Sequence, residues 1–561
     1  MNKTTDKRPA SPRERGSGSG AGMFAGLRRH LLQSLIARRF YRHTLKGRVP
    51  SGVGLKIGQT WPGDPKRGMA IAAGDIALVG PLVRNPAPCW FPPAGAEEWY
   101  AAWHGFDWVT DLLAAGPAGR DLTRELVQSW LAAESDVRSV VWRSDILGTR
   151  LFAWITHFDE LVGTKEPAFR RAVLASMARQ YRHLARTAAW EVEGAARLRA
   201  LKGLIGGILA FGGSPQRLAR TLAALERETG AQFFADGGHR SRSPSVQLRV
   251  LRDLVDIRSM LRAQKIEPPR ALQETIERAA PMLRMFRHGD RRLALFNDSL
   301  EEDGLLIDLL LTQSETKGRS TTHASDSGFE RLQAAKSLII VDTGTRPPPS
   351  FDGHAHAGAL SFEMSHERER IIVNCGAYRG TKPNWWRVPR TSAAHSVLVV
   401  ADTNSTEIRD DGVVNRAPLS VTCERAEHEG QQWISATHDG YRERFGLIYT
   451  RELFLAADGD DVRGEDRLIG RPGANFTVRF HLHPSVEAAL VDQTGAALHL
   501  PSGTCWQLRA AGAEISLGES IYLGSGEAQK TQQVMLSGTA EPGGTTVRWA
   551  LRRQTGQTGF A

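Results

Sequence analysis

Cysteine is scarce in this chain of 561 residues. Its four cysteines, Cys89, Cys375, Cys423 and Cys505, lie far apart and form no Cys-x-x-Cys pair. This spacing argues against both a zinc ribbon and a disulfide framework, and it predicts buried thiols.

Long apolar runs are absent as well. The longest candidates, residues 204–213 and 305–312, fall short of the roughly 18 residues that a membrane-spanning helix needs. Residues 1–22 are polar and rich in Gly and Ser, so they lack the apolar stretch of a cleavable secretory signal. The sequence therefore predicts neither a transmembrane helix nor a cleavable signal.

Several common catalytic and nucleotide-binding motifs are missing from the sequence. The sequence contains no GxxxxGK[ST], no strand-linked GxGxxG and no HExxH, so nucleotide-binding and zinc-protease folds have no support. No recognisable motif supports a hydrolase with paired carboxylates either.

Positive charge is concentrated at the N-terminus. Residues 1–50 hold twelve Lys and Arg and only two acids, which accounts for nearly all of the net charge of +11. A nucleic-acid-binding protein carries its charge on a folded face, so we expect no nucleic-acid partner. We interpret residues 1–22 as a disordered basic tail and residues 24–46 as a basic amphipathic helix. That helix either packs on the domain or makes peripheral contact with an anionic membrane.

Helical periodicity dominates from about residue 118 to residue 290. The segments are roughly 14 to 22 residues long, several follow a Ser or Asp, and short linkers join them. Consecutive helices should therefore pair antiparallel. This pattern predicts a helical toroid or solenoid.

The residue pattern changes near residue 315. A polar, breaker-rich stretch is followed by short alternating segments such as KSLIIVDTG and FTVRFHLHP, which are typical of strands. Helices followed by strands indicate separate domains. We predict an α+β multidomain chain with a disordered tail (1–22), an (α/α) helical toroid (23–315) and an antiparallel β-sandwich (316–561).

The richest stretch for chemistry is DGHAHAGALSFE, residues 352–363. If it forms a strand, His354 and His356 project from the same face and can converge on one ligand. A strand end supplies Asn374, and His395 starts a later strand. Nitrogen and oxygen donors from three strands suit Zn or another divalent ion, although two hydrogen-bonded histidines without a metal are the alternative.

These three segments, in this order, resemble the C-terminal domain of the heparinase II/III family of polysaccharide lyases, from about Phe329 to Phe480 and including FHLHP. The resemblance implies that His354 is catalytic. It also implies that His356, Asn374 and His395 hold a structural metal. The family has an acid at the position of Asn374, and a neutral amide is a poorer ligand for a divalent cation.

The helical part is similar to the toroid of the same family, in particular to its proteobacterial branch. The stretches that carry this resemblance are PGDPKRG, WEVEGAARLRALKGLIGG and FADGGHRSRSPSVQLRVLRDL. Ser241 and Val246 stand where characterised lyases have a Glu and a catalytic Tyr, and residues 181–200 offer no convincing Asn. The usual Tyr/Asn machinery is therefore missing.

Cleavage of a uronic-acid glycoside by β-elimination requires a base, a proton donor and a group that neutralises the carboxylate. We expect His354 to act as the base and either His239 or Tyr378 to act as the second proton-transfer group. For His239 the alternative is a loop residue near the start of a helix, and for Tyr378 it is loop anchoring.

Substrate binding is assigned to residues near these motifs. Arg242 or Arg390 would clamp the carboxylate, as Arg does in bidentate fashion. Trp385 would stack on a sugar ring or else anchor its loop.

The function that we predict is binding and β-elimination of an acidic, uronate-containing polysaccharide between toroid and sandwich. The alternative is a catalytically inactive glycan-binding or envelope protein that keeps the lyase fold. The resemblance points to the periplasm or cell envelope, whereas the lack of a signal leaves the cytoplasm open. The sequence gives no oligomeric state.

Overall fold

A computed structural model describes residues 40–58, 61–80, 82–85, 90–91, 97–133, 140–163, 167–380, 382, 385–410 and 412–554. The predicted tail 1–22 and most of the predicted basic helix 24–46 lie outside these residues. So does Cys89. Among the other cysteines, Cys375 is buried as predicted, whereas Cys423 and Cys505 are half-buried.

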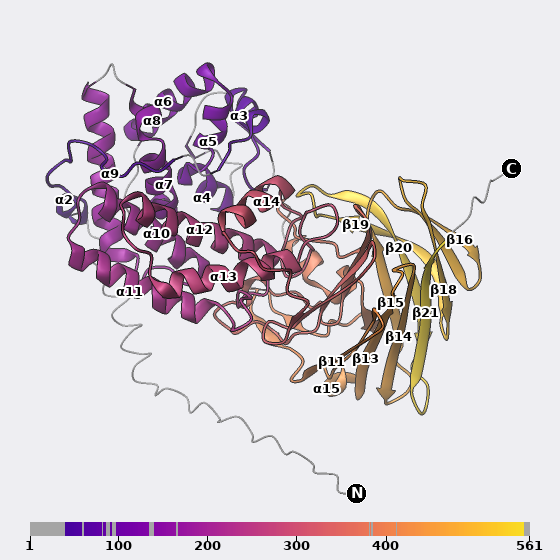
Figure 1. Ribbon diagram of the computed structural model, residues 1–561. Helices are drawn as coiled ribbons and strands as arrows, with labels where there is room; N and C mark the ends of the chain where they lie inside the picture. The colour runs from indigo at the N-terminus through magenta and orange to yellow at the C-terminus, as the bar shows by residue number, and fades with distance from the viewer. Residues whose placement is uncertain are drawn as a thin grey trace, which may run out of the picture.

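The chain folds into a helical part followed by a strand part, side by side (Figure 1). This arrangement confirms the predicted helical toroid and antiparallel β-sandwich. The helices are α2 (Tyr41–Thr44), α3 (Pro65–Ala72), α4 (Glu97–Gly105), α5 (Val109–Ala114), α6 (Pro117–Ala132), α7 (Ser144–Thr156), α8 (Phe158–Val162), α9 (Pro167–Thr187), α10 (Gly194–Ala210), α11 (Pro215–Gln232), α12 (Pro244–Ala263), α13 (Arg270–Met285), α14 (Gly304–Gln313) and the short α15 (Arg442–Phe445) within the strand part.

Several helices begin as their local sequence dictates. Helices α3, α11 and α12 have Pro in the first turn, after Asp64, Ser214 and Ser243. The side-chain oxygen of each of these caps accepts a backbone N–H of the first turn, which satisfies a donor that the helix itself leaves unpaired. Among the described residues, no helix is long and apolar enough to cross a membrane.

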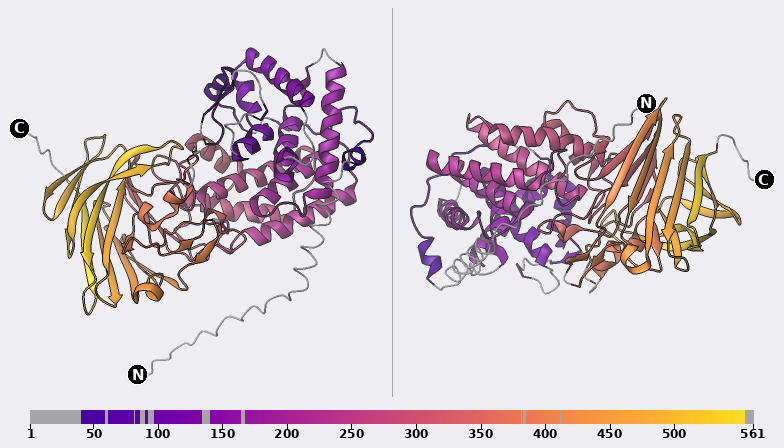
Figure 2. Two further views of the ribbon diagram at one scale, coloured as in Figure 1. Left: turned by 180° about the vertical axis from the view of Figure 1, so that it is seen from behind. Right: turned by 90° about the horizontal axis from the view of Figure 1, so that it is seen from below.

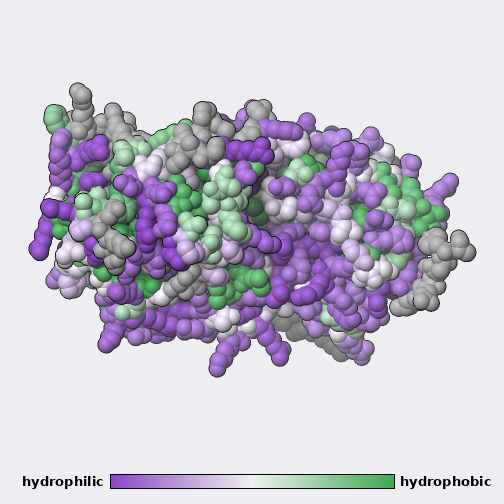
Figure 3. Space-filling model, turned by 90° about the horizontal axis from the view of Figure 1, so that it is seen from above, coloured by the Kyte–Doolittle hydropathy of each residue, from purple (hydrophilic) through white to green (hydrophobic). Residues whose placement is uncertain are grey.

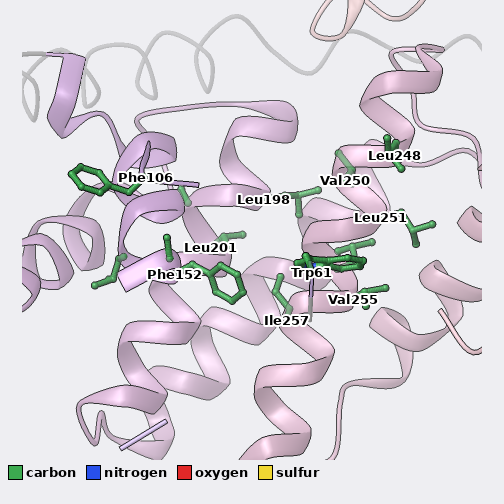
Figure 4. Packing of buried hydrophobic residues seen from close by; sticks show 14 of the residues in the cluster. Trp61, Phe106, Phe152, Leu198, Leu201, Leu248, Val250, Leu251, Val255 and Ile257 are labelled. Carbon is green, nitrogen blue, oxygen red and sulfur yellow. The ribbon is translucent and has the colours of Figure 1, made fainter. Parts of the chain in front are cut away.

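One apolar core joins the helices. Figure 4 shows Trp61, from the loop before α3, among buried side chains of α12 such as Val255 and Leu251 and of α10 such as Leu198. The indole N–H of Trp61 donates to buried Asp256 at 2.7 Å. Burial of large aromatic and branched side chains drives this packing at roughly 25 cal/mol per Å² of apolar surface.

Two antiparallel sheets form the sandwich (Figures 1 and 2). The outer, eight-stranded sheet has the order β11-β12-β13-β14-β21-β18-β17-β16. Its strands are β11 (Val421–His428), β12 (Gln431–His438), β13 (Leu447–Leu455), β14 (Asp461–Gly470), β16 (Glu487–Asp492), β17 (Gly495–His499), β18 (Cys505–Ala511) and β21 (Thr545–Arg553).

The second, nine-stranded sheet lies nearer the helices. Its order is β19-β20-β15-β7-β6-β5-β4-β3, and β8 pairs with β15. The strands are β3 (His323–Ala324), β4 (Phe329–Ala334), β5 (Ser337–Asp342), β6 (Phe362–His366), β7 (Glu369–Val373), β8 (Leu398–Val400), β15 (Asn475–Leu482), β19 (Glu514–Tyr522) and β20 (Gln529–Thr539). Two small hairpins, β1–β2 (Asp75–Ile76, Val83–Arg84) and β9–β10 (Glu407–Ile408, Val414–Arg416), complete the strands.

Buried hydrogen bonds join the two parts. The Glu363 carboxylate, fully buried on β6, accepts from His288 Nε2 at 3.0 Å and from the backbone N–H of Leu295 at 3.1 Å. Tyr522 of β19 donates its hydroxyl to buried Glu301. The segment after α13 is thereby bonded directly to the sandwich, which fixes the side chains that it carries.

Candidate functional site

The expected pair of histidines does not lie on a strand. Residues Asp352–His354 form a 3₁₀ turn, and Ala355 continues in extended conformation. The prediction that both rings share one strand face is therefore wrong. His354 is 41% exposed and bonds to Asp298, whereas His356 is buried and bonds to His395.

His354 forms a dyad with Asp298. Its Nδ1 lies 2.8 Å from Asp298 Oδ2, and because a carboxylate only accepts, Nδ1 carries a proton. In the neutral form of the ring, Nε2 then has the lone pair. Arg379 donates to Asp298 Oδ1 at 2.9 Å and to its backbone carbonyl at 3.0 Å. Burial acts to raise the pKa of Asp298, but Arg379 and His354 hold it well below its usual value, so Asp298 is a fixed anion.

The backbone beside the dyad is strained. Asn297 and Asp298 have φ of 47° and 60°, and Glu302 has φ of 58°. Non-glycine residues adopt this left-handed conformation at a cost, and such residues gather at functional sites. The Asn297 side chain holds the turn by donating to the Arg242 carbonyl and accepting from the His356 N–H.

Arg249 of α12 completes what we call the junction cluster: His354, Asp298, Arg379, Glu302 and Arg249. Its guanidinium makes no hydrogen bond to a described residue, and its ion pair with Glu302 spans 3.9 Å. The side chain is 42% exposed. Burial and the neighbouring charges of Arg199 and Arg379 lower the pKa of Arg249. Its one ion pair is long and is not supported by a hydrogen bond, so the guanidinium is available to a ligand.

Figure 3 shows hydrophilic side chains gathered where the helical and strand parts meet. Arg199 of α10 adds a second available cation there. Its guanidinium makes no hydrogen bond to a described residue and lies 3.8 Å from Asp253. Sequence reasoning missed Asp298, Arg379, Arg249 and Arg199 as site residues. Arg199 and Arg249 lie within the helical stretches that carry the resemblance, but nothing local marks either of them as a ligand-binding cation.

Arg242 and Arg390 do not fit the clamp expected of them. Arg242 is buried, donates to the carbonyls of residues 327, 328 and 345, and pairs with Asp342. Arg390 is also buried and donates to the carbonyl of Ala355 at 2.8 Å. Both guanidinium groups satisfy loop carbonyls, so they hold loops in place and do not face a ligand.

His239 does not fit a proton-transfer role either. It is 3% exposed, and its ring nitrogens bond to Ser241 at 2.8 Å and to Gln232 at 3.0 Å. Burial lowers its pKa to about 3. His239 therefore remains neutral and connects the end of α11 to the loop before α12, close to the loop role that was its alternative.

Tyr378 and Trp385 lie together in the loop after β7. Their rings are 5.5 Å apart and both are half-buried. The Tyr378 oxygen accepts from the N–H of Lys382 at 2.9 Å, which leaves its O–H to donate. Tyr378 is adjacent in sequence to Arg379 of the junction cluster. Its role as a proton donor and the stacking role of Trp385 stay predictions.

The donor set of the expected metal site is incomplete. His356 Nδ1 and His395 Nε2 are 3.2 Å apart, and burial lowers the pKa of both rings, that of His395 to about 4. Asn374 Oδ1 is already bonded to the N–H of Ser396 at 3.0 Å, and Asn374 Nδ2 is buried without a partner.

An amide NH₂ is no metal ligand. Within the described ranges, no group of three or more His, Cys, Asp or Glu could hold a metal. The residues present do not fit a divalent ion, and the geometry is that of a hydrogen bond between two neutral imidazoles.

Fold and site together place a charged cluster between a helical toroid and a β-sandwich. Residues 316–550 match the family model "Heparinase II/III-like, C-terminal". This match is to the family that the sequence motifs predicted.

Solved structures share the fold over nearly the whole chain. Heparinase III is similar with a TM-score of 0.72 at 14% identity, covering 96% of this chain and 92% of that one. The heparan sulfate lyase HepC from Pedobacter heparinus has a TM-score of 0.59 at 15% identity, covering 96% and 91%. At such identities the likeness shows the fold alone.

One relative is similar in sequence across both parts. The FtsZ-localized protein C of Caulobacter vibrioides is 28% identical over 541 residues, covering 90% of this chain and 91% of the relative. Its name records an association with FtsZ.

Proposed function

We propose that the junction cluster binds an acidic glycan and that Arg249 meets its carboxylate. The observation that carries this proposal is the guanidinium of Arg249, partly exposed, without a hydrogen bond and 3.9 Å from its nearest acid. A guanidinium binds a planar carboxylate with two parallel hydrogen bonds. The lyase-like scaffold around it supports a sugar acid as the source of that carboxylate.

The dyad supplies proton transfer for β-elimination. The lone pair on His354 Nε2 takes the proton from the carbon next to the carboxylate. The electron pair of that C–H bond forms a carbon–carbon double bond, and the glycosidic oxygen on the next carbon leaves. Asp298 stabilises the imidazolium that forms, and the imidazolium then returns its proton to the leaving oxygen.

Arg249 assists this chemistry electrostatically. Neutralising the carboxylate makes the neighbouring C–H more acidic, because the negative charge that develops on proton removal spreads onto the carboxylate oxygens. Tyr378 would be a second proton donor if its loop brings the hydroxyl to the leaving oxygen. This assignment rests on its free O–H and on its place next to Arg379.

A second function is favoured by a separate observation. The relative that matches along 90% of this chain carries the name of an FtsZ-localized protein. His239, one of the two residues expected as the second proton-transfer group, is buried with both nitrogens bonded. A glycan-binding protein that localises with FtsZ and performs no elimination agrees with both facts.

Ultraviolet absorbance distinguishes the two functions, because elimination leaves an unsaturated uronate that absorbs in the ultraviolet. The purified chain is incubated with heparan sulfate, hyaluronan, alginate and polygalacturonate, and binding is measured in parallel by calorimetry. Elimination that disappears in His354→Ala supports the lyase. Binding without elimination supports the second function, and a fluorescent fusion in dividing cells then tests whether the chain localises with FtsZ.

Variants of α12 test the anion site. Arg249→Ala should weaken glycan binding about tenfold or more, since a charge-assisted pair contributes about 1.5 to 3 kcal/mol. Arg262→Ala is the matched control. Arg262 lies on the same helix with 47% exposure but is paired with Glu315 at 2.6 Å. Equal loss in both variants, or no glycan bound by the parent chain, would refute the proposal.

A further inference from the structure

The outer sheet carries a groove that has no part in the junction cluster. It has a volume of about 450 Å³, within the range of small-molecule sites. Figure 1 shows this sheet on the side of the molecule away from the helices. The opposite face of the sheet packs into the sandwich core through residues such as Leu453, Leu508 and Leu551, so the groove is on the solvent side.

Strand register explains the floor of the groove. Trp433 is paired with Phe454, Phe454 with Arg463, Arg463 with Ala550, and Ala550 with Arg509. Directly paired residues project from the same face. Two aromatic rings therefore stand at one end of the row, while the small side chain of Ala550 leaves room beside them.

Trp433 is available to a ligand. It is half-buried, and its indole N–H makes no hydrogen bond to a described residue. Phe454 is held in place by the guanidinium of Arg463, which lies 5.6 Å from the centre of its ring. The groove thus offers an aromatic surface with a free donor at its edge.

The arginines of the groove are already paired. Arg463 donates to Asp461 at 2.7 Å, Arg548 donates to Glu465 at 2.8 Å, and Arg509 pairs with Asp492. This differs from Arg249, whose guanidinium has no hydrogen bond. Since each cation is matched by an anion, an acidic ligand would gain little here. The charge pattern is complementary to a neutral ligand.

We propose that this groove binds a neutral oligosaccharide. A sugar ring has an apolar C–H face that packs on an aromatic ring, and its hydroxyls both donate and accept. In the Arg548–Glu465 pair, the carboxylate can accept hydrogen bonds from such hydroxyls and the guanidinium can donate hydrogen bonds to them. Trp433 would pack on the ring and give its N–H to a hydroxyl.

The consequence is that this chain contacts glycan at two places of different charge. The junction cluster meets an acidic unit, and the sheet groove meets a neutral one. The groove proposal stands without the first, because none of its residues belongs to the junction cluster.

Binding of defined neutral sugars to the full chain tests the groove. Maltohexaose, cellohexaose, laminarihexaose and chitohexaose are titrated by calorimetry, with tryptophan fluorescence as a second readout. At least one should bind. Trp433→Ala should reduce its affinity about tenfold or more, and Trp433→Phe should retain part of the binding. Phe454→Ala reports on the platform if Trp433→Ala proves unstable.

Two controls separate the outcomes. Trp190→Ala removes a half-buried indole from the helical part and should leave neutral-sugar binding unchanged. Arg249→Ala should do the same, even if it abolishes binding of acidic glycans. No binding of any neutral sugar would overturn the proposal. So would a dimer in light scattering that Trp433→Ala dissociates, because the groove would then be an interface between copies of the chain.

Discussion

Asp298→Asn separates the electrostatic role of the dyad from its shape. Asparagine is nearly isosteric and tolerates the left-handed φ of 60° that this position requires. The substitution removes the charge of a carboxylate whose Oδ2 lies 2.8 Å from His354 Nδ1 and whose Oδ1 accepts from Arg379 at 2.9 Å. The imidazolium formed on proton transfer then lacks its counter-ion.

We expect Asp298→Asn to slow elimination and to lower the stability of the fold. Elimination should slow by about 10² to 10⁴-fold, the usual contribution of a positioned acid–base group. The Arg379 side chain is only 15% exposed, and removing one partner of a buried ion pair costs about 3 to 5 kcal/mol. Since the Asp298 side chain is 19% exposed, we expect the lower figure, which lowers the melting temperature by about 6 to 12 °C in a domain of 150 to 250 residues.

The stability loss should depend on pH. Because the folded pKa of Asp298 lies below its ordinary value of 3.8, its stabilising contribution is full above about pH 4. That contribution is lost as the pH falls through the folded pKa. Melting temperatures of parent and Asp298→Asn should therefore differ at pH 7 and converge in acid.

The matched control is Asp290→Asn. Asp290 accepts from buried Arg370 at 2.8 Å and is 22% exposed, yet it lies outside the junction cluster. It should cost similar stability and leave glycan binding and elimination unchanged. If Asp298→Asn keeps full elimination activity, or if Asp290→Asn loses as much of it, the dyad is structural and our reasoning about His354 fails.

Two further predictions concern buried polar groups. Asn374→Asp replaces the buried, unpartnered Nδ2 with a carboxylate oxygen, the type of ligand that the expected site with His356 and His395 lacks, so metal content and chelator-sensitive melting temperature should rise. Metal analysis that finds no ion in this variant contradicts the idea. His239 has a folded pKa of about 3 against 6.5, so it costs stability as the pH falls below 6.5, about 2 kcal/mol at pH 5. His239→Gln should therefore lose less stability between pH 8 and pH 5 than the parent in urea unfolding, and equal losses would contradict this.

The features that the sequence predicted correctly are local ones. Helix starts such as Ser214-Pro215 and Ser243-Pro244 need only neighbouring residues. Alternation with a period of two identifies strands such as Ser337–Asp342 in the same way. The architecture of toroid and sandwich follows from these local patterns, taken in order along the chain.

The histidine pair shows where local reasoning failed. Spacing of i and i+2 places two rings together only if the backbone is extended. The 3₁₀ turn at Asp352–His354 rotates one ring away from the other. His354 consequently meets a carboxylate 56 residues earlier in the chain, and His356 meets a ring 39 residues later.

The arginines show a second limit. Three arginines, Arg242, Arg249 and Arg262, lie within one short stretch of sequence. Of these three, only Arg249 is available to a ligand. Arg242 donates to loop carbonyls and pairs with Asp342, and Arg262 pairs with Glu315. Which guanidinium stays free depends on the acceptors that the fold brings to it, and those come from residues 315 to 345, far along the chain.

Left-handed backbone conformations also gather around the site. Four non-glycine residues around it, Arg242, Asn297, Asp298 and Glu302, hold left-handed φ angles. Asn and Asp tolerate this conformation, whereas it costs Arg242 and Glu302 roughly 1 to 3 kcal/mol each. Arg242 offsets part of this cost by donating to loop carbonyls, and Asn297 donates to the carbonyl of Arg242. This backbone conformation positions Asp298, so that a fixed anion bonds to His354 in the same cluster as the cation Arg249 of α12.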